Sequence, residues 1–135
     1  MNKILIAIFF LLLVSCVLEP TPDDRLLIIN RSGKVICFDY EVDTVLHVPS
    51  INKKEFFIRE RLDPGDSTRV EKVNNKDQWV WDVSHGKDST LSIFIFDYEQ
   101  VLKTDWDTLR ANGRYKRLDY KLSDLNKNNW TVIVK

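Results

Sequence analysis

Few residues in this chain combine the type and the spacing that catalysis requires. The two histidines, His47 and His85, lie far apart in the sequence, and neither belongs to an HExxH or CxxC motif or to another metal-ligand spacing. GxSxG, P-loop and GxGxxG motifs are absent, and four glycines are too few for loops that cradle phosphate. His85 precedes Gly86 in a polar stretch that is typical of a solvated turn. The sequence therefore predicts neither a cofactor nor a catalytic histidine.

Carboxylates are abundant, and two arrangements of them could do chemistry. A pair of carboxylates could hydrolyse a glycan, but the fold sets such pairs and most domains of this size contain candidates. Asp39, Glu41 and Asp43 alternate, so in a strand they share one face and could bind Ca²⁺. Charges in this pattern also keep an exposed strand edge from aggregating, which is the interpretation we favour. The sequence predicts no metal site, and a hydrolytic carboxylate pair stays an alternative.

Aromatic residues are the other candidates for ligand contact. Trp79 and Trp81, with Phe56 and Phe57, could form a platform for a sugar or a peptide. Large aromatic side chains more often fill the core of a small domain, so both interpretations stay open here. Trp79 and Trp81 are the predicted ligand-binding residues.

The two cysteines have different surroundings. Cys37 lies in the apolar run Val35–Phe38, which predicts a buried core thiol rather than a reactive one. Cys16 ends a stretch that begins with the positive Lys3 and continues with the apolar run Ile4–Val14. This run is too short to span a bilayer, but it suits the apolar part of a secretory signal peptide.

The segment Leu13-Val14-Ser15-Cys16 resembles the lipobox of bacterial lipoproteins, an aliphatic residue followed by two smaller positions and cysteine. The resemblance implies cleavage before Cys16, a thioether-linked diacylglycerol on its thiol and acylation of the new amino terminus. The alternatives are a plain secretory signal with a chance cysteine, or a core segment. We expect a signal peptide over residues 1–15 and a lipid on Cys16, because the charge of Lys3, the length of the apolar run, the lipobox-like segment and the polar stretch after it all agree. More than one acyl chain would anchor the protein stably to a membrane.

A polar tether over residues 16–24 is expected to join this anchor to a single domain over residues 25–135. Pro20 and Pro22 favour extended backbone, and the acidic residues of VLEPTPDD are expected to keep the tether solvated. Loss of Lys3 with the signal peptide lowers Lys plus Arg from 20 to 19, against 20 Asp plus Glu. No basic excess remains, so we expect no nucleic-acid partner.

Alternating and β-branched stretches predict a mainly-β domain. We expect a two-layer β-sandwich or a covered antiparallel sheet with one or two short helices, with an α+β fold as the alternative. The predicted strands are Leu26–Asn30, Val35–Tyr40, Glu55–Leu62, Ser67–Val73, Thr90–Asp97, Arg114–Leu122 and Trp130–Val134. The turn signal Arg31–Lys34 predicts that the first two form a hairpin. Thr90–Asp97 is apolar on both faces, which indicates a central strand.

Three other segments show helical signals. Gln78–Ser84 fits either a strand or a short helix. Thr104 is expected to cap a short helix, with Asp107 completing a capping box. A helical turn is expected at Ser123–Leu125. Trp106 and Trp130 each open an amphipathic element and are expected in the core, since large aromatics usually fill the core of a domain this small.

The last third of the chain resembles a known group of proteins. The segments that carry the resemblance are LSIFIFD (91–97), TDWDTLRANG (104–113), YKRLDYKLSDL (115–125) and NNWTVIV (128–134). Together they look like a group of small envelope lipoproteins of gut Bacteroidetes, in which a FIFD strand precedes a short acidic-aromatic helix and a final strand. The resemblance implies an envelope location and a single domain. It implies no activity, so no functional residue is transferred from the group.

These features favour a non-enzymatic binding or accessory module that the lipid on Cys16 holds at a membrane of the bacterial envelope, the outer membrane above all. Its partners would be the membrane, through the lipid, and a glycan or a protein. Two alternatives are an enzyme with an unrecognised carboxylate site, such as a glycan hydrolase, and a structural subunit of a surface complex. A deep cleft with converging carboxylates would favour the enzyme, and an exposed apolar patch would favour the subunit.

Overall fold

The computed structural model describes residues 21–135, so the predicted signal peptide, Cys16 and most of the predicted tether lie outside the described residues. In the described part of the chain, six strands form two sheets of three strands each. Sheet A has the order β3 (Ser67–Lys72), β1 (Asp23–Asn30) and β6 (Thr131–Val134). Sheet B has the order β2 (Ile36–Glu41), β4 (Thr90–Asp97) and β5 (Lys116–Lys121).

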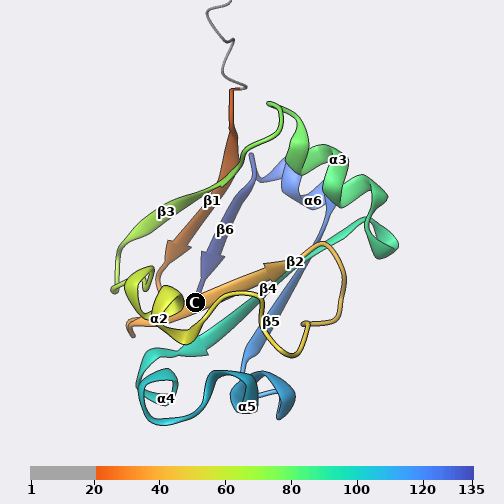
Figure 1. The fold of residues 1–135 in the computed structure, drawn as a ribbon. Helices are drawn as coiled ribbons and strands as arrows, with labels where there is room; N and C mark the ends of the chain where they lie inside the picture. The colour runs from red at the N-terminus through yellow and green to blue at the C-terminus, as the bar shows by residue number, and fades with distance from the viewer. Residues whose placement is uncertain (1–20) are drawn as a thin grey trace, which may run out of the picture.

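Short helices cover one face of sheet B and close one end of the molecule (Figure 1). They are α2 (Lys54–Arg59), α3 (Gln78–His85), the 3₁₀ helix η1 (Lys87–Ser89), α4 (Tyr98–Lys103), α5 (Trp106–Ala111) and α6 (Leu122–Lys127). Helices α4 and α5 lie on the side of sheet B that faces away from sheet A, whereas α3 and α6 lie together at the opposite end of the molecule. Among residues 21–135, no helix has the length and apolar character needed to cross a bilayer.

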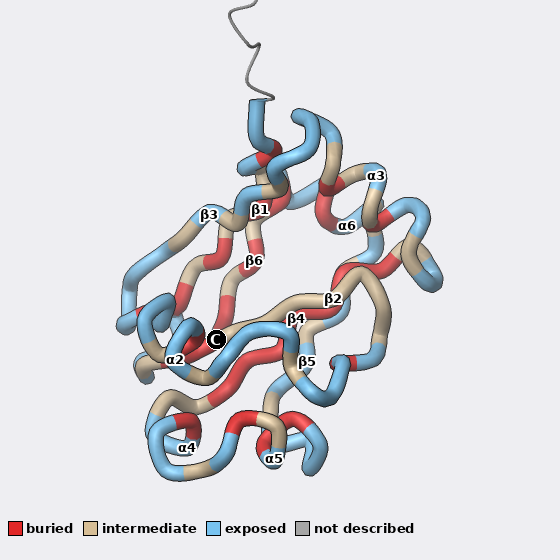
Figure 2. Tube along the Cα trace, viewed as in Figure 1, coloured by how far each residue is buried: buried red, intermediate tan, exposed pale blue. Residues whose placement is uncertain are grey.

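The core has two parts, and β4 contributes to both. Its Leu91, Ile93 and Ile95 pack in the cluster between the two sheets, which the buried Trp79 and Trp130 complete. Its other face carries Phe94 and Phe96, which pack with Cys37 of β2 and with Trp106 and Leu109 of α5. Figure 2 shows β4 buried along nearly its whole length. The predicted central strand and the core positions of Cys37, Trp106 and Trp130 are therefore confirmed.

The predicted mainly-β fold is confirmed as two packed sheets, with more helix than expected. We expected one or two short helices, and residues 21–135 contain five α-helices. Gln78–Ser84 adopts the helical alternative, as α3. The strands predicted over Arg114–Leu122 and Trp130–Val134 and the helical turn at Ser123–Leu125 are present as β5, β6 and α6.

The predicted hairpin between the first two strands is wrong. β1 pairs antiparallel with β3 and parallel with β6, whereas β2 pairs with β4 in the other sheet. The buried side chain of Asn30 explains how the chain leaves sheet A. Its Nδ2 donates to the carbonyl oxygens of Lys34, Leu62 and Asp63, and its Oδ1 accepts from the amide and hydroxyl of Ser32. These bonds satisfy backbone groups of the segment after β1 and of residues 62 and 63, and they hold the two segments together.

The strand predicted over Glu55–Leu62 is also wrong, because most of this segment is helix α2. Phe57 is buried and stacks on Trp106 with 4.2 Å between ring centroids, whereas Phe56 stays partly exposed. The alternation that we interpreted as a strand therefore does not match the buried face. Only Leu62 makes a strand-like contact, an isolated antiparallel bridge to Ile36. Ser67–Val73 is a strand as predicted, and it pairs antiparallel with β1.

Two predicted boundaries shift. Thr104 is the C-cap of α4, and the N-cap of α5 is Asp105, whose carboxylate accepts from the Thr108 amide at 2.9 Å. The predicted tether overlaps β1, which begins at Asp23. Asp23 is not solvated as we expected for a tether residue, because it is buried.

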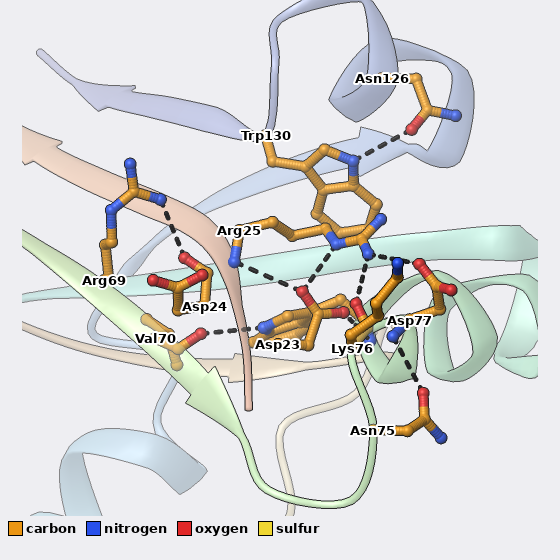
Figure 3. Close-up of polar contacts among 11 residues, drawn as sticks. Asp23, Asp24, Arg25, Arg69, Val70, Asn75, Lys76, Asp77, Asn126 and Trp130 are labelled. Carbon is orange, nitrogen blue, oxygen red and sulfur yellow. Dashed lines mark hydrogen bonds and ion pairs between the residues drawn. The ribbon is translucent and has the colours of Figure 1, made fainter. Parts of the chain in front are cut away.

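Asp23 is buried because it joins the start of β1 to α3 (Figure 3). Its Oδ2 accepts from the Trp79 amide at 2.9 Å, which satisfies one of the free N–H groups in the first turn of α3. Arg25 Nε donates to Asp23 Oδ1 at 2.7 Å, and Arg25 Nη2 donates to Asp77 Oδ1 and to the Lys76 carbonyl. The guanidinium also lies over the Trp130 ring, 5.3 Å from its centroid. The end of the domain that follows the predicted anchor is thus held firmly to the core.

A candidate ligand-binding groove

A groove of about 510 Å³ lies between the edge of sheet A and the edge of sheet B. Strands β2 and β3, helix α2 and the loop of residues 42–53 form its walls, and Arg110 of α5 closes it from the helical side. We call it the β2–β3 groove. Figure 1 shows α2 and this loop beside the two edge strands.

The backbone of β2 is open toward the groove. Ile36 donates to and accepts from Leu62 on this side, with distances of 3.0 and 2.9 Å. In an antiparallel strand, the backbone N–H and C=O groups of every second residue point to the same side. The backbone groups of Phe38 and Tyr40 therefore point away from β4, as those of Ile36 do. The Tyr40 amide is bonded to Asp39 Oδ1 at 2.8 Å. Among residues 21–135, the outward N–H and C=O of Phe38 and the C=O of Tyr40 have no backbone partner.

The opposite wall is also a sheet edge. Asn30 donates to the Asp66 carbonyl at 2.9 Å, and this bond sets the alternation along β3. Thr68 and Val70 therefore direct their backbone groups toward β1, and Arg69 directs its backbone groups away from it. Two strand edges with open hydrogen-bonding groups thus border the same groove.

Exposed apolar side chains form the rim. Ile51 is 96% exposed and Phe56 is 39% exposed, and both line the groove. Val45 and Val48, in the same loop as Ile51, are exposed as well. Single exposed apolar residues are ordinary, but two that line one hollow, with two more in the adjoining loop, are typical of a contact surface.

Two carboxylates of the groove, those of Asp39 and Glu41, contact an arginine and a histidine side chain. Arg110, whose side chain is only 2% exposed, pairs with Asp39 and donates from Nε and Nη2 to the His47 carbonyl. The His47 ring Nδ1 lies 3.1 Å from Glu41 Oε1. The predicted shared face of Asp39, Glu41 and Asp43 is thus divided, since Asp43 bonds to the Thr44 amide instead. In the part of the chain that the structure describes, no group of three or more His, Cys, Asp or Glu side chains is placed to hold a metal ion.

The groove carries a net negative charge. Four carboxylates line it, against two guanidinium groups. Asp39 is already paired with Arg110, whereas Glu60 and Glu71 are exposed. Burial, together with the charges of Asp39, Glu41 and Asp82, raises the pKa of Tyr40, so its phenol stays protonated and neutral at physiological pH. Cationic groups would be favoured near this rim.

Trp79 and Trp81 do not form the platform that the sequence suggested. Trp79 is fully buried, donates from Nε1 to the Val70 carbonyl at 2.9 Å, and packs behind Tyr40 with 5.1 Å between ring centroids. Trp81 is exposed on the outside of α3, where its ring stacks on His85. Trp79 therefore supports the wall of the groove without lining it, and Trp81 lies outside the groove.

Sequence reasoning found only part of the groove. Phe56, one of the aromatic candidates, lines the rim. Phe38, Tyr40 and Ile51 were missed as contact residues. Phe38 and Tyr40 carried a signal, because they alternate with acidic residues on a strand that turned out to be an edge. Ile51 stands between serine and asparagine in a polar loop, where an apolar side chain has no core to enter. The lipid-attachment residue Cys16 lies outside the described residues.

A second hollow, of about 570 Å³, lies near the start of β5 and the end of β6. It is more open to solvent, and its rim is basic, with Lys34, Arg114 and Lys116. Lys116 donates to the carbonyl oxygen of Lys135 at 2.9 Å. The β2–β3 groove is the better enclosed of the two and is therefore the stronger candidate.

Comparison with known proteins gave no match, either to a family model or to a curated protein or solved structure.

Proposed function

We propose that this protein is a membrane-held, non-enzymatic binding module whose ligand site is the β2–β3 groove. The amino-terminal sequence supports the anchor, because an apolar run of signal-peptide length ends in the lipobox-like Leu13–Cys16. The lipid on Cys16 would hold the domain at the bacterial envelope, with the outer membrane as its location.

The observation that carries the binding function is the open edge of β2 beneath an exposed apolar rim. A ligand in the groove would remove Ile51 and Phe56 from water, at about 25 cal/mol for each Å² of apolar surface buried. The hydrolytic alternative is less favoured, because two of the four carboxylates that line the groove, those of Asp39 and Glu41, already contact Arg110 and His47.

Membrane attachment is tested by comparing the full-length chain with Cys16→Ala in fractionated bacterial cells. We expect the unaltered protein in the membrane fraction and the variant in the soluble fraction, because the variant has no thiol to accept the lipid. Membrane attachment that survives the substitution would overturn the anchored part of the proposal.

Ligand binding is tested with a panel of oligosaccharides and peptides against the full-length chain purified in detergent. The variants Ile51→Ser and Phe56→Ser alter the rim, and Leu102→Ser alters an exposed residue of α4 as a matched control. We expect any specific ligand to lose at least tenfold in affinity with each rim variant and to bind the control variant as it binds the unaltered protein. Ligands that bind all four proteins equally would place the site elsewhere.

A further inference from the structure

We propose that the β2–β3 groove binds an extended polypeptide segment, which adds to the edge of β2 as a further strand and carries Lys or Arg. This inference rests on the proposed function and names the ligand class of the same site.

The backbone of β2 supplies the first argument. Its outward N–H and C=O groups at Phe38, and the C=O at Tyr40, repeat with the two-residue spacing of a strand edge. Only another extended backbone matches such a row of alternating donors and acceptors over its length. A sugar could use one or two of these groups, but their spacing along the strand suits a peptide.

The chain itself forms only the first contact of such a strand pairing. Leu62 pairs antiparallel with Ile36 at one end of the groove. The preceding residues would continue the pairing toward Phe38, but they fold into α2, which ends at Arg59 and has Glu60 as its C-cap. Among residues 21–135, the edge therefore stays open from Phe38 onward, and the guest segment would lie where residues 54–61 would lie if they continued as a strand along β2.

The walls fit the side chains of such a segment. Successive side chains of an added strand point to opposite faces, as they do along β2. One set would meet Ile51 and Phe56, and the other set would meet Val70 of β3. Several apolar side chains in alternation would thus be covered together, which favours a segment that alternates apolar residues.

The charge of the groove selects among such segments. Glu60 and Glu71 are exposed at the rim, and Glu60 pairs with Arg59 only at the surface. Both guanidinium groups of the groove are already engaged, Arg110 with Asp39 and Arg69 with the Asp24 carbonyl. A segment with Lys or Arg would therefore gain favourable contacts that an acidic segment would lose.

The test uses an unbiased library of twelve-residue peptides, selected on the full-length chain in detergent. Each selected peptide is then synthesised with single N-methyl groups along its backbone. We expect alternating apolar residues with at least one Lys or Arg. We also expect N-methylation to weaken binding at least tenfold at every second residue and less than threefold between them, because only alternate amides face β2. A flat N-methyl profile, or the absence of any selected peptide, would overturn the inference.

Charge-reversed variants test the acidic rim. Glu60→Lys and Glu71→Lys are expected to weaken the selected peptides at least tenfold, whereas Glu99→Lys, exposed on α4, should leave affinity within twofold. Equal effects of the three variants would overturn the assignment of charge. Oligosaccharides whose binding is lost in Ile51→Ser would preserve the proposed function and overturn the peptide assignment. Ligands whose affinity is the same for the rim variants and the unaltered protein would overturn the proposed function itself.

Discussion

Replacing Asn30 with alanine should destabilise the whole domain, because its side chain joins the turn of residues 32–34 to residues 62 and 63 at the point where the chain passes between the sheets. Nδ2 donates at 2.7 Å to Lys34 and at 2.9 Å to Leu62. Oδ1 accepts at 3.0 Å from the Ser32 amide and at 2.7 Å from its hydroxyl. The residue is fully buried, so water cannot replace these bonds at the side chain.

The magnitude follows from these four bonds. Each contributes about 0.5–1.5 kcal/mol net, and unpaired buried acceptors add a further cost. Two effects reduce this loss, because Leu62 keeps its bond from the Ile36 amide and the partly exposed Ser32 hydroxyl can turn to solvent. We expect Asn30→Ala to lower the free energy of unfolding by about 2–4 kcal/mol, which corresponds to a fall in Tm of roughly 10–15 °C for a domain of this size.

Urea denaturation of the full-length chain, followed by tryptophan fluorescence, measures this loss, because Trp79 and Trp130 lie in the core. Asn74→Ala, at an exposed position before α3, is the matched control and should change stability by less than about 0.5 kcal/mol. Equal midpoints for Asn30→Ala and Asn74→Ala would refute the view that this side chain directs the chain between the sheets. Asn30→Asp provides a second check. At neutral pH it should be less stable than Asn30→Ala, since a carboxylate cannot donate to the Lys34 and Leu62 carbonyls.

Three further predictions concern residues around the groove and the core. Gly86→Ala should cost about 1–3 kcal/mol in chemical denaturation, because a Cβ there would lie 2.2 Å from the Val42 carbonyl oxygen, and an unchanged midpoint would contradict this close approach. Arg110→Met should cost about 2–4 kcal/mol by leaving Asp39 without its partner, and adding Asp39→Asn should recover part of the loss; strictly additive losses would show that the pair is not coupled. Burial raises the pKa of the Cys37 thiol to about 12 from 9.0, so above pH 9 the unfolded chain ionises this thiol and the folded chain does not. Between pH 9 and 11, the free energy of unfolding of the unaltered protein should therefore fall with pH more steeply than that of Cys37→Ala, by about 1 kcal/mol per pH unit. Equal slopes for the two proteins would contradict the burial of this thiol.

The elements that could be predicted from the sequence are those whose pattern reflects their own burial. β4 is apolar on both faces because both faces are covered, and β6 alternates because one of its faces packs into the core. Partners at long range could not be predicted. β2 pairs with β4, whereas β1 pairs with β3 and β6, and no local pattern in these strands indicates which partner each takes.

The groove shows the same limit. Its walls come from β2, α2, β3 and α5, and no local pattern reveals that these elements meet. Most of the segment Glu55–Leu62 forms α2 instead of the predicted strand, and its Phe57 packs against Trp106, a contact between distant parts of the chain. That helix is also the reason why the edge of β2 stays open. The sequence directed attention to Trp79 and Trp81 by their size, whereas the groove is lined by the less conspicuous Phe38, Tyr40 and Ile51.

The exchange rate of the Phe38 amide hydrogen tests the central claim most directly. This amide points from β2 into the groove and has no backbone partner among the described residues. In the full-length chain, we expect it to exchange at least tenfold more slowly when a peptide selected from the library is bound, while the Trp81 amide, which bonds to the Asp77 carbonyl on α3, exchanges at an unchanged rate. A bound peptide that leaves the exchange rate of Phe38 unchanged would show that the ligand does not pair with the edge of β2.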